Sequence, residues 1–374
     1  MKFNTTTKRL QEAVSKVILA VPTKSLDARF DNINMTLENG TLTMFATDGE
    51  LSITAKCDVA SSDKGTIAIR ARTLQDFLRS MYDTEVTFEI ERQSIGELGT
   101  VHIATDKGRY RIPCTFISKP ESLERNFDLT IGLQPSELQD IIQKTLFACS
   151  VDGMRPAMMG VLFEFEGTVI TAVSTDGHRL VRCRKQTTNE IAEKQKIVVP
   201  ARVLSIIQRL LQNDEVSMTV DEERRNVRFK SENVELESAL IVEPYPNYEA
   251  VIPVENEKKL VVDRGLIHDS VKRVGRFSSI GDLKINAEGE LMKVMAENAS
   301  EGESAQEELP CSFAGEEITI GFNAKFVEAA LSHIETEEVS IEMSSPTTAV
   351  LFKPKYEERQ DDLIILVMPV RINN

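Results

Sequence analysis

IAIRARTLQDFLRSMYDTEVTFEI at residues 67–90 and IVVPARVLSIIQRLLQNDEVSMTV at residues 197–220 are two copies of one pattern. They align without a gap, with identical residues at Ile67/Ile197, Ala71/Ala201, Arg72/Arg202, Leu74/Leu204, Arg79/Arg209, Glu85/Glu215 and Val86/Val216. A third copy, ITIGFNAKFVEAALSHIETEEVSIEM at 318–343, needs two extra residues. Each copy predicts a short strand, a helix with one apolar face and a second strand that begins with Glu-Val. The spacing of the copies exceeds the periods of solenoids and propellers, so each repeat is long enough to form a domain.

The length and composition of the chain agree with three domains. Its 374 residues fit three units of about 120 residues, and a hydrophobic content of 41% is typical of globular proteins. Two stretches rich in proline and charge, 118–127 and 244–260, are the expected connectors. We therefore expect domains at 1–120, 127–246 and 255–374.

Each repeat is expected to open with a helix, followed by an antiparallel strand pair. The helices are predicted at 8–21, 136–149 (capped by Ser136) and 265–275. The strand pairs are predicted at 32–59, where Asn39-Gly40 is a strong hairpin turn signal, at 160–185 and at 282–298. Together with the repeated helices these elements predict an α+β fold, with three similar tandem domains and the helices gathered on one side of antiparallel sheets.

The remaining general signals favour a protein of the reducing cytoplasm. No apolar run is long enough to span a bilayer, and the N-terminus lacks the apolar core of a signal peptide. The five cysteines are scattered, without a CxxC pair or a histidine at metal-ligand spacing. We expect buried free cysteines, no metal site and no cofactor.

The distribution of charge points to a partner. The chain carries a net charge of −15, yet the six predicted helices together carry +7, so the rest carries −22. One interpretation is that helix surfaces are simply charged. The other is that helices of all three repeats form a basic surface on an acidic body, which would attract phosphates without reading sequence. No helix-turn-helix, zinc finger or ladder of aromatic residues accompanies the basic residues, so neither base readout nor base stacking is supported.

The sequence offers little support for catalysis. It contains no P-loop, no dinucleotide-binding glycine motif, no HExxH and no GxSxG. The one constellation to consider is Ser174, Asp176 and His178, which would make the alternative a β-rich hydrolase. Three residues within five positions of a strand end cannot easily converge as nucleophile, base and orienting group. We therefore expect a binding protein rather than an enzyme.

Several segments make the resemblance to a known family specific. VSTDGHRLVRC at 173–183 and VMPVRIN at 367–373 resemble the hallmark segments of the bacterial sliding clamps, the beta subunits of the replicative DNA polymerase III holoenzyme. NGTLTMFATDGE, RPAMMGVLFEFEG at 155–167 and YPNY at 245–248 are similar to that family in order and spacing. The resemblance covers essentially the whole chain. It implies a head-to-tail homodimeric ring with helices on the inner face, sheets outside and duplex DNA passing through.

The resemblance also implies three sets of functional residues. By position, Lys24, Arg72 and Arg202 would face DNA, with Arg79 and Arg209 added by repeat equivalence. A hydrophobic groove would receive short linear motifs of the replicative polymerase, the clamp loader and repair proteins. Its residues would be Arg155, Met158, Thr175, Gly177, His178, Arg179, Leu180, Pro246, Val251, Leu366, Val367, Met368, Pro369, Val370 and Arg371.

Charge suggests how two copies would pair. Arg109 and Arg111 lie in GRYRIP at 108–113, whereas EGESAQEEL at 301–309 is acidic and includes Glu307 and Glu308. Opposite charge at opposite ends of the chain favours head-to-tail pairing. A non-ring scaffold of three repeats stays open as a second alternative.

Overall fold

The computed structural model describes residues 1–25, 27–93, 96–118, 125–210, 216–356 and 362–371. It forms two compact units, one of Met1–Pro135 with Ile206–Leu240 and the other of Ser136–Ser205 with Ile241–Asn374. Residues 119–124 of the first predicted connector and the tail 372–374 lie outside the described residues.

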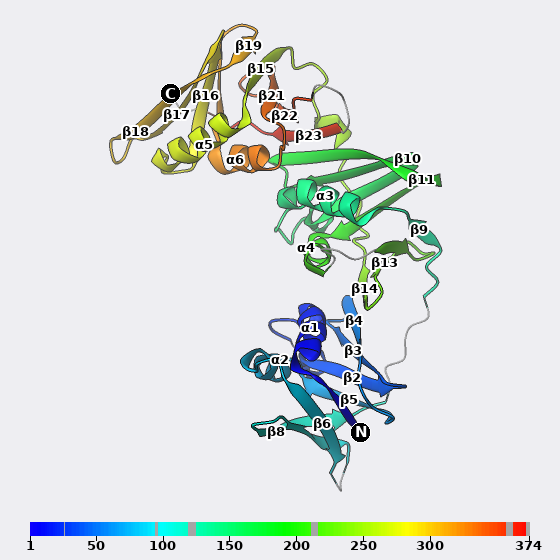
Figure 1. Cartoon of the computed structure of the whole chain (residues 1–374). Helices are drawn as coiled ribbons and strands as arrows, with labels where there is room; N and C mark the ends of the chain where they lie inside the picture. The colour runs from blue at the N-terminus through cyan, green and yellow to red at the C-terminus, as the bar shows by residue number, and fades with distance from the viewer. Residues whose placement is uncertain (26, 94–95, 119–124, 211–215, 357–361, 372–374) are drawn as a thin grey trace. The chain divides into compact units, whose positions relative to one another are not determined.

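The first unit is built on one antiparallel sheet (Figure 1). Its strands follow the order β1-β6-β7-β8-β5-β2-β3-β4-β14-β13-β12-β9. Buried and partly exposed residues alternate along β2 and β3, as a sheet with one covered face requires. The strands are β1 (Lys2–Thr6), β2 (Asn32–Glu38), β3 (Thr41–Thr47), β4 (Leu51–Asp58), β5 (Gly65–Arg70), β6 (Glu85–Arg92), β7 (Leu98–Ala104), β8 (Arg109–Phe116), β9 (Leu129–Ile131), β12 (Ser217–Val220), β13 (Asn226–Lys230) and β14 (Val234–Ala239).

Helices α1 (Thr7–Val17) and α2 (Ala71–Ser80) of the first unit pack against each other, and α1 packs on β3 and β4 (Figure 1). Short 3₁₀ turns occupy η1 (Ile18–Ala20) and η2 (Ala28–Asp31). The α-helix therefore stops earlier than the predicted 8–21, because the chain tightens into η1 before Pro22.

The second unit contains two sheets, ordered β10-β11-β23-β22-β21-β15-β19 and β18-β17-β16-β20. Its strands are β10 (Gly160–Thr175), β11 (Arg179–Pro200), β15 (Lys258–Asp263), β16 (Asp282–Glu288), β17 (Leu291–Asn298), β18 (Glu303–Pro310), β19 (Ser312–Ala314), β20 (Ile318–Asn323), β21 (Glu338–Met343), β22 (Val350–Pro354) and β23 (Asp362–Val367).

The remaining helical segments follow the predicted repeats. They are α3 (Pro135–Thr145), η3 (Leu146–Ala148), η4 (Pro156–Met159), α4 (Ala201–Leu210), η5 (Glu249–Val251), α5 (Arg264–Val274), η6 (Gly275–Phe277) and α6 (Ala324–Ser332). Helices α5 and α6 lie side by side, like α1 and α2 (Figure 1). Helix α3 begins at Pro135, so Ser136 lies inside its first turn and the predicted cap there is wrong. Proline suits the first helical position because its missing N–H has no partner there in any case.

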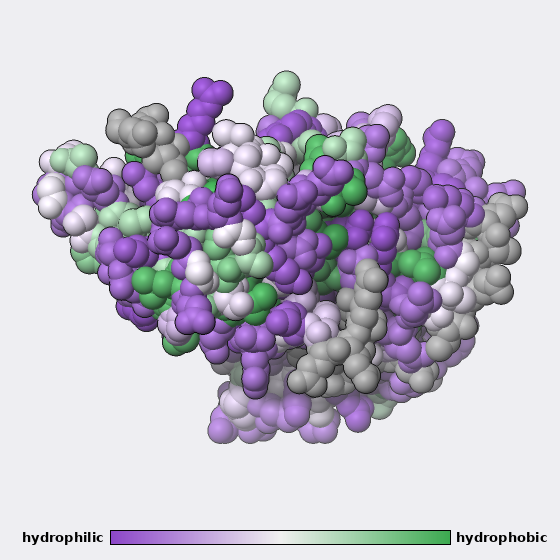
Figure 2. Space-filling view, turned by 90° about the horizontal axis from the view of Figure 1, so that it is seen from above, coloured by the Kyte–Doolittle hydropathy of each residue, from purple (hydrophilic) through white to green (hydrophobic). Residues whose placement is uncertain are grey.

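The predicted hairpins at 32–59 and 282–298 are present, whereas in 160–185 a single strand, β10, runs from Gly160 to Thr175 and pairs with β11. Asn39 and Gly40 join β2 to β3 with φ of 53° and 77°, as the Asn-Gly signal requires. Interior positions of the sheets carry the apolar residues, and the face in Figure 2 is mostly hydrophilic, with hydrophobic residues in small separate patches. The α+β prediction is confirmed.

Two strand pairs join neighbouring repeats. In what we call the first junction, β4 pairs with β14, and Ser52 lies opposite Glu237. In the second junction, β11 pairs with β23, and Leu180 lies opposite Leu366. In each case a strand of one repeat receives the last strand of the next.

Candidate functional site

The second junction carries an apolar floor within the second unit. It is formed by buried residues of β10, β11, β22, β23, the connector and the turn before β22, namely Leu162, Val173, Leu180, Val198, Tyr248, Ala349, Leu351, Ile364 and Leu366. Three partly buried residues, Ile241, Tyr245 and Ile252, pack against this cluster. The predicted groove residues Leu180 and Leu366 therefore meet, although they lie at distant positions in the sequence.

The loop that precedes Leu180 is held by its own side chains. The carboxylate of Asp176 accepts hydrogen bonds from the backbone N–H groups of His178 (2.9 Å) and Arg179 (3.0 Å). Thr175 Oγ1 accepts a bond of 3.1 Å from the Gly177 N–H. Gly177 has a φ of 90°, a conformation that favours glycine. The Thr-Asp-Gly sequence thus builds a rigid rim beside the floor.

The tail after β23 completes the rim. The backbone N–H of Met368 donates a bond of 2.8 Å to the carbonyl oxygen of His178. Met368 and Val251 keep 39% and 53% of their surfaces exposed, so both can contact a ligand. Pro246 is half-buried in the connector. The hydrogen bond of Met368 therefore ties the tail to the loop that precedes Leu180.

Arg155 contacts the loop, and Met158 follows three residues later in the chain. Arg155 Nη1 donates to the Asp176 carbonyl oxygen at 3.0 Å, and Met158 is half-buried in η4. A Cβ added at Gly177 would lie 2.7 Å from Arg155 Nη1, so this glycine leaves room for the guanidinium.

Arg179 lies between two aromatic rings. Its guanidinium is 5.3 Å from the centroid of Phe147 and 4.9 Å from that of Phe326, and it also binds Asp176. Its role is therefore to support the loop. Phe326 was not predicted as part of this site, because nothing in the sequence around it indicates that it meets Arg179.

Three further contributors, Tyr245, Tyr248 and Ile252, were also not predicted. Tyr245 donates through its hydroxyl to the Val173 carbonyl oxygen at 3.2 Å, and burial raises its pKa well above the usual range. The YPNY segment signalled a match to the family, but its pattern does not say which side chains cover the floor.

The end of the described tail turns to another surface. Val370 donates its N–H to the Gly321 carbonyl oxygen at 2.9 Å. Val370 and Arg371 line a cavity of about 450 Å³ together with residues of β16 and β17. Val367 is buried in β23. The predicted tail residues thus divide between floor, rim and this neighbouring cavity.

The hydrolase alternative is contradicted by geometry. Ser174 is fully buried, and its hydroxyl donates to the Thr145 carbonyl oxygen at 2.5 Å. Asp176 is bound by Arg179 and backbone N–H groups, while His178 is exposed and lies 6.1 Å from the Phe326 ring centroid. Ser174 is thus committed to another partner, and the three residues do not form a catalytic chain.

The candidate DNA-facing residues lie on exposed surfaces. In the first unit Arg72 Nη2 donates to the carbonyl oxygens of Pro22 (3.3 Å) and Thr23 (3.0 Å), which places its charge beside Lys24. Arg79 is exposed on the same helix, α2. Arg202 and Arg209 are exposed on α4.

The candidate pairing strands have free edges within the described residues. Strand β8 pairs with β7 from Arg109 onward but with β5 only at Cys114–Phe116, and β18 pairs only with β17. Arg109 and Arg111 are exposed. Glu307 is held by Arg273 through two bonds of 2.8 Å, which lower the pKa of Glu307, and Glu308 lies 3.3 Å from Lys293.

Three general features complete the description. Within the described ranges, no helix is long and apolar enough to cross a membrane. The same residues contain no group of three His, Cys, Asp or Glu side chains placed to hold a metal ion. The five cysteines are free, and burial raises the pKa of Cys149 to about 12.

Comparison with known proteins gives one consistent result. Models of the N-terminal, central and C-terminal domains of the DNA polymerase III beta subunit match residues 1–110, 132–247 and 249–371. The beta sliding clamp of Pseudomonas putida is 26% identical over 348 residues, which is 91% of this chain and 92% of the relative. That of Rickettsia bellii is 25% identical over 393 residues and covers 100% of both chains.

Solved structures show the same fold. A sliding clamp from Pseudomonas aeruginosa bound to griselimycin has a TM-score of 0.91 at 24% identity, with 100% of both chains covered. A C. crescentus clamp, with polyethylene glycol bound to its putative beta-motif tethering region, has a TM-score of 0.91 at 24% identity and covers 100% of this chain and 99% of that one. Because the three domain models together match most of the sequence, the chain belongs to the family of the DNA polymerase III beta subunit, the sliding clamp, which is a processivity factor and not an enzyme.

Proposed function

We propose that two copies of this chain close head to tail into a ring that encircles duplex DNA in the cytoplasm. The ring would tether the replicative polymerase, the clamp loader and repair proteins through the groove of the second junction. Its domains would be 1–120, 127–246 and 255–374. The observation that carries this proposal is the equivalence of the two junctions.

That equivalence holds residue by residue. Ser52 pairs with Thr47 across the β3–β4 hairpin as Leu180 pairs with Thr175 within β10–β11. Each then meets the last strand of the next repeat, Ser52 at Glu237 and Leu180 at Leu366. Two of the three possible junctions are thus formed inside the chain, and β18 and β8 are the corresponding strands left for a third.

The same rule predicts the register of the third junction. Ser304 is the counterpart of Ser52, because Ser304 pairs with Glu297 in its hairpin as Ser52 pairs with Thr47. Arg111 is the counterpart of Glu237, because Arg111 pairs with His102 as Glu237 pairs with Arg228. Ser304 should therefore lie opposite Arg111 of the second copy, and Gln306 opposite its Arg109. A head-to-tail contact of this kind closes two copies into a ring when the rotation that relates one copy to the next permits it.

The register also separates the two candidate glutamates. Side chains alternate along a strand, so Ser304, Gln306 and Glu308 share one face of β18, with Glu308 diagonal to Arg109 of the second copy. Glu307 points to the other face, where Arg273 of α5 already binds it. We therefore assign the intermolecular ion pair to Glu308, and an intramolecular role to Glu307.

The proposed contact with DNA rests on exposed basic helices. Lys8 and Arg9 of α1 are exposed, as are Arg72 and Arg79 of α2, Arg202 and Arg209 of α4, and Lys24 nearby. Lysines and arginines without a fixed base contact attract phosphates but set no register, which suits a protein that slides.

The groove would bind short segments that carry a glutamine and spaced leucine or phenylalanine side chains. Its apolar floor with an exposed methionine at the rim suits varied apolar side chains. Burial of two such side chains contributes roughly 3–6 kcal/mol before ordering costs, so we expect micromolar affinity.

Retention on DNA tests the ring directly. Protein loaded on closed circular DNA should remain bound in high salt and should leave when a restriction enzyme linearises that DNA. Light scattering should give the mass of a dimer. Equal retention on linear and circular DNA, or the mass of a monomer, would favour the non-ring scaffold.

A further inference from the structure

The first junction has the strand arrangement of the second but a different chemistry. Arg228 lies opposite Glu237 across β13–β14, in the position that Leu351 and Leu366 occupy across β22–β23. Glu235 corresponds in the same way to Ile364, since Glu235 lies two residues before Glu237 on β14 and Ile364 lies two residues before Leu366 on β23. The floor residues Leu180, Leu351, Ile364 and Leu366 are thus matched by Ser52, Arg228, Glu235 and Glu237.

These polar residues line a groove of their own. A cavity of about 520 Å³ lies over β2, β3, β4, β13 and β14, and its lining includes Phe45, the counterpart of Val173. The cavity lies entirely within the first unit. The first junction therefore has room for a ligand, and its shape alone would not exclude one.

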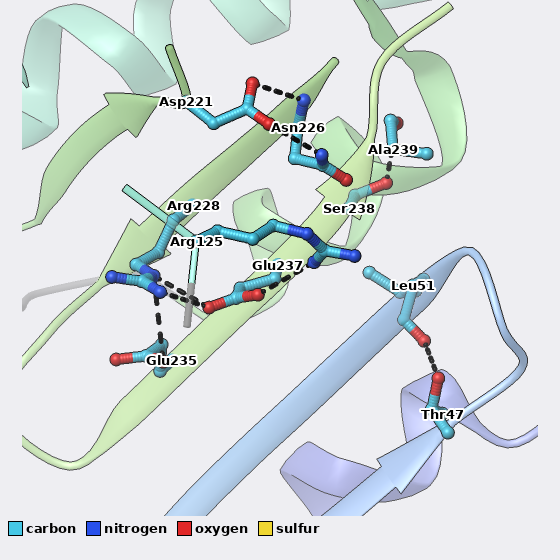
Figure 3. A network of polar contacts seen from close by, with 10 residues as sticks. All are labelled: Thr47, Leu51, Arg125, Asp221, Asn226, Arg228, Glu235, Glu237, Ser238 and Ala239. Carbon is cyan, nitrogen blue, oxygen red and sulfur yellow. Dashed lines mark hydrogen bonds and ion pairs between the residues drawn. The ribbon is translucent and has the colours of Figure 1, made fainter. Parts of the chain in front are cut away.

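Charge distinguishes it instead. Figure 3 shows Glu237 between two arginines: Arg228 donates to its Oε1 through Nε (2.8 Å) and Nη2 (2.5 Å), and Arg125 Nη1 donates to its Oε2 at 3.3 Å. Glu235 adds a second carboxylate 3.7 Å from Arg228 Nε. The ion pairs are partly shielded, because the side chains of Arg228 and Glu237 are only 25% and 18% exposed.

An apolar ligand would meet a penalty at this floor. A leucine or phenylalanine side chain placed over Glu237 would remove water from paired charges without offering them a hydrogen bond. Ser52 offers no apolar surface to compensate, where Leu180 does. The penalty is specific to the chemistry of the ligand, since the cavity has room for it.

We propose that Ser52, Arg228, Glu235 and Glu237 exclude apolar partner motifs from the first junction, so that each chain offers a single docking groove. The four residues are specificity determinants for the partner site, and this inference rests on the proposed peptide-binding function of the second junction. Without them, a partner could dock at either of two equivalent positions on one chain and so in two different places on the ring.

The test transplants the second junction's residues into the first. The variant Ser52→Leu, Arg228→Leu, Glu235→Ile and Glu237→Leu places each counterpart at its equivalent position. A short synthetic peptide with a glutamine followed by leucine and phenylalanine is titrated by calorimetry. The wild type should bind one peptide per chain and the variant two, with the second Kd within about tenfold of the first.

A smaller variant guards against loss of folding. Arg228→Leu with Glu237→Leu removes both members of the central ion pair together, a change that proteins often tolerate. Arg125, whose side chain is 36% exposed, can then be hydrated. This variant should bind a second peptide more weakly than the fourfold variant, with its thermal unfolding within a few degrees of the wild type.

Matched controls separate specific binding from nonspecific binding of the peptide to added apolar surface. Glu232→Leu with Asn233→Leu adds two leucines to the β13–β14 hairpin outside the cavity lining and should leave one peptide per chain. The reciprocal change, Leu351→Arg with Leu366→Glu, should abolish binding at the second junction. A second peptide bound by the hairpin control would overturn the proposal.

The outcomes distinguish the inference from the function on which it rests. A folded fourfold variant that still binds one peptide per chain would refute the inference alone. A wild type that binds no peptide would refute the proposed groove at the second junction. If the fourfold variant then binds one peptide per chain, the result would still support the inference that the four polar residues exclude apolar motifs from the first junction.

Discussion

The backbone N–H of Met368 donates a hydrogen bond of 2.8 Å to the carbonyl oxygen of His178. This bond continues the β11–β23 ladder by one step beyond the pair of Arg179 with Val367. It joins the tail to the Thr-Asp-Gly loop and so makes one surface from two distant segments. Because the bond uses only backbone atoms, side chains at the rim can be changed without releasing the tail.

The first prediction concerns this rim. Met368→Ala with Pro369→Ala should abolish polymerase stimulation and weaken the motif peptide at least about tenfold, because apolar contact area is lost while the tail stays in place. Primer extension and peptide calorimetry measure the two effects. Met154→Ala, which truncates an exposed methionine in another loop, is the control. Wild-type stimulation by the double variant would place the partner site elsewhere.

The second prediction concerns ring closure. Arg109→Glu with Arg111→Glu should raise the dimer dissociation constant at least about tenfold, since like charges would then face Glu308. Sedimentation at nanomolar concentration measures this. Adding Glu308→Arg should restore part of the affinity, whereas adding Glu307→Arg should not, because Glu307 already binds Arg273.

The control for that experiment reverses two exposed charges elsewhere, Lys64→Glu with Arg225→Glu, and should leave the dimer intact. A dimer that persists at nanomolar concentration after reversal of Arg109 and Arg111 would remove them from the interface.

The third prediction concerns DNA. Arg72→Glu with Arg202→Glu should reduce loading onto circular DNA several-fold and flatten its salt dependence, because two phosphate contacts become repulsive. Filter binding across a salt series measures both, and the Lys64/Arg225 reversal again serves as control. Thermal unfolding should change little, since both arginines are exposed. Unchanged loading would exclude these positions from the DNA path.

The fourth prediction concerns pH. His333 stacks on Phe147 with ring centroids 3.8 Å apart, and burial lowers its pKa below the usual value of about 6.5. The unfolded chain therefore binds a proton more readily than the folded one, so the free energy of unfolding should fall as pH drops below about 6.5.

Urea titrations between pH 5 and 8 can isolate this contribution. His333→Gln should show a shallower loss of stability with acid than the wild type, because it removes the histidine whose pKa burial lowers. Parallel curves for His333→Gln and the wild type would show that this histidine does not control the slope.

The fifth prediction concerns the loop glycine. Gly177→Ala should destabilise the protein by about 1–2 kcal/mol through backbone strain at φ 90° and should weaken peptide binding, because the new Cβ displaces the Arg155 guanidinium. Gly281→Ala is the matched control, since Gly281 has a φ of 82° with no atom within 4 Å of its added Cβ. It should show the strain without the loss of binding. Equal peptide affinity of both variants would remove Arg155 from the rim.

Local patterns were enough to predict the repeats, the Asn39-Gly40 turn and the apolar helix faces, because hydrophobic period and turn chemistry act over a few residues. The composition of the groove followed from resemblance, which named Leu180, Met368 and their neighbours. No local pattern indicated that Tyr245 would cover the floor or that Arg179 would lie between Phe147 and Phe326.

Only the tertiary structure decided which strands meet and in which register. Leu180 faces Leu366 and Ser52 faces Glu237 because β11 receives β23 and β4 receives β14, pairings between segments far apart in the chain. A shift of one residue in either ladder would turn these side chains to the opposite face. The sequence by itself therefore determined three similar domains, whereas long-range strand pairing gave one junction an apolar cluster and the other a charged counterpart.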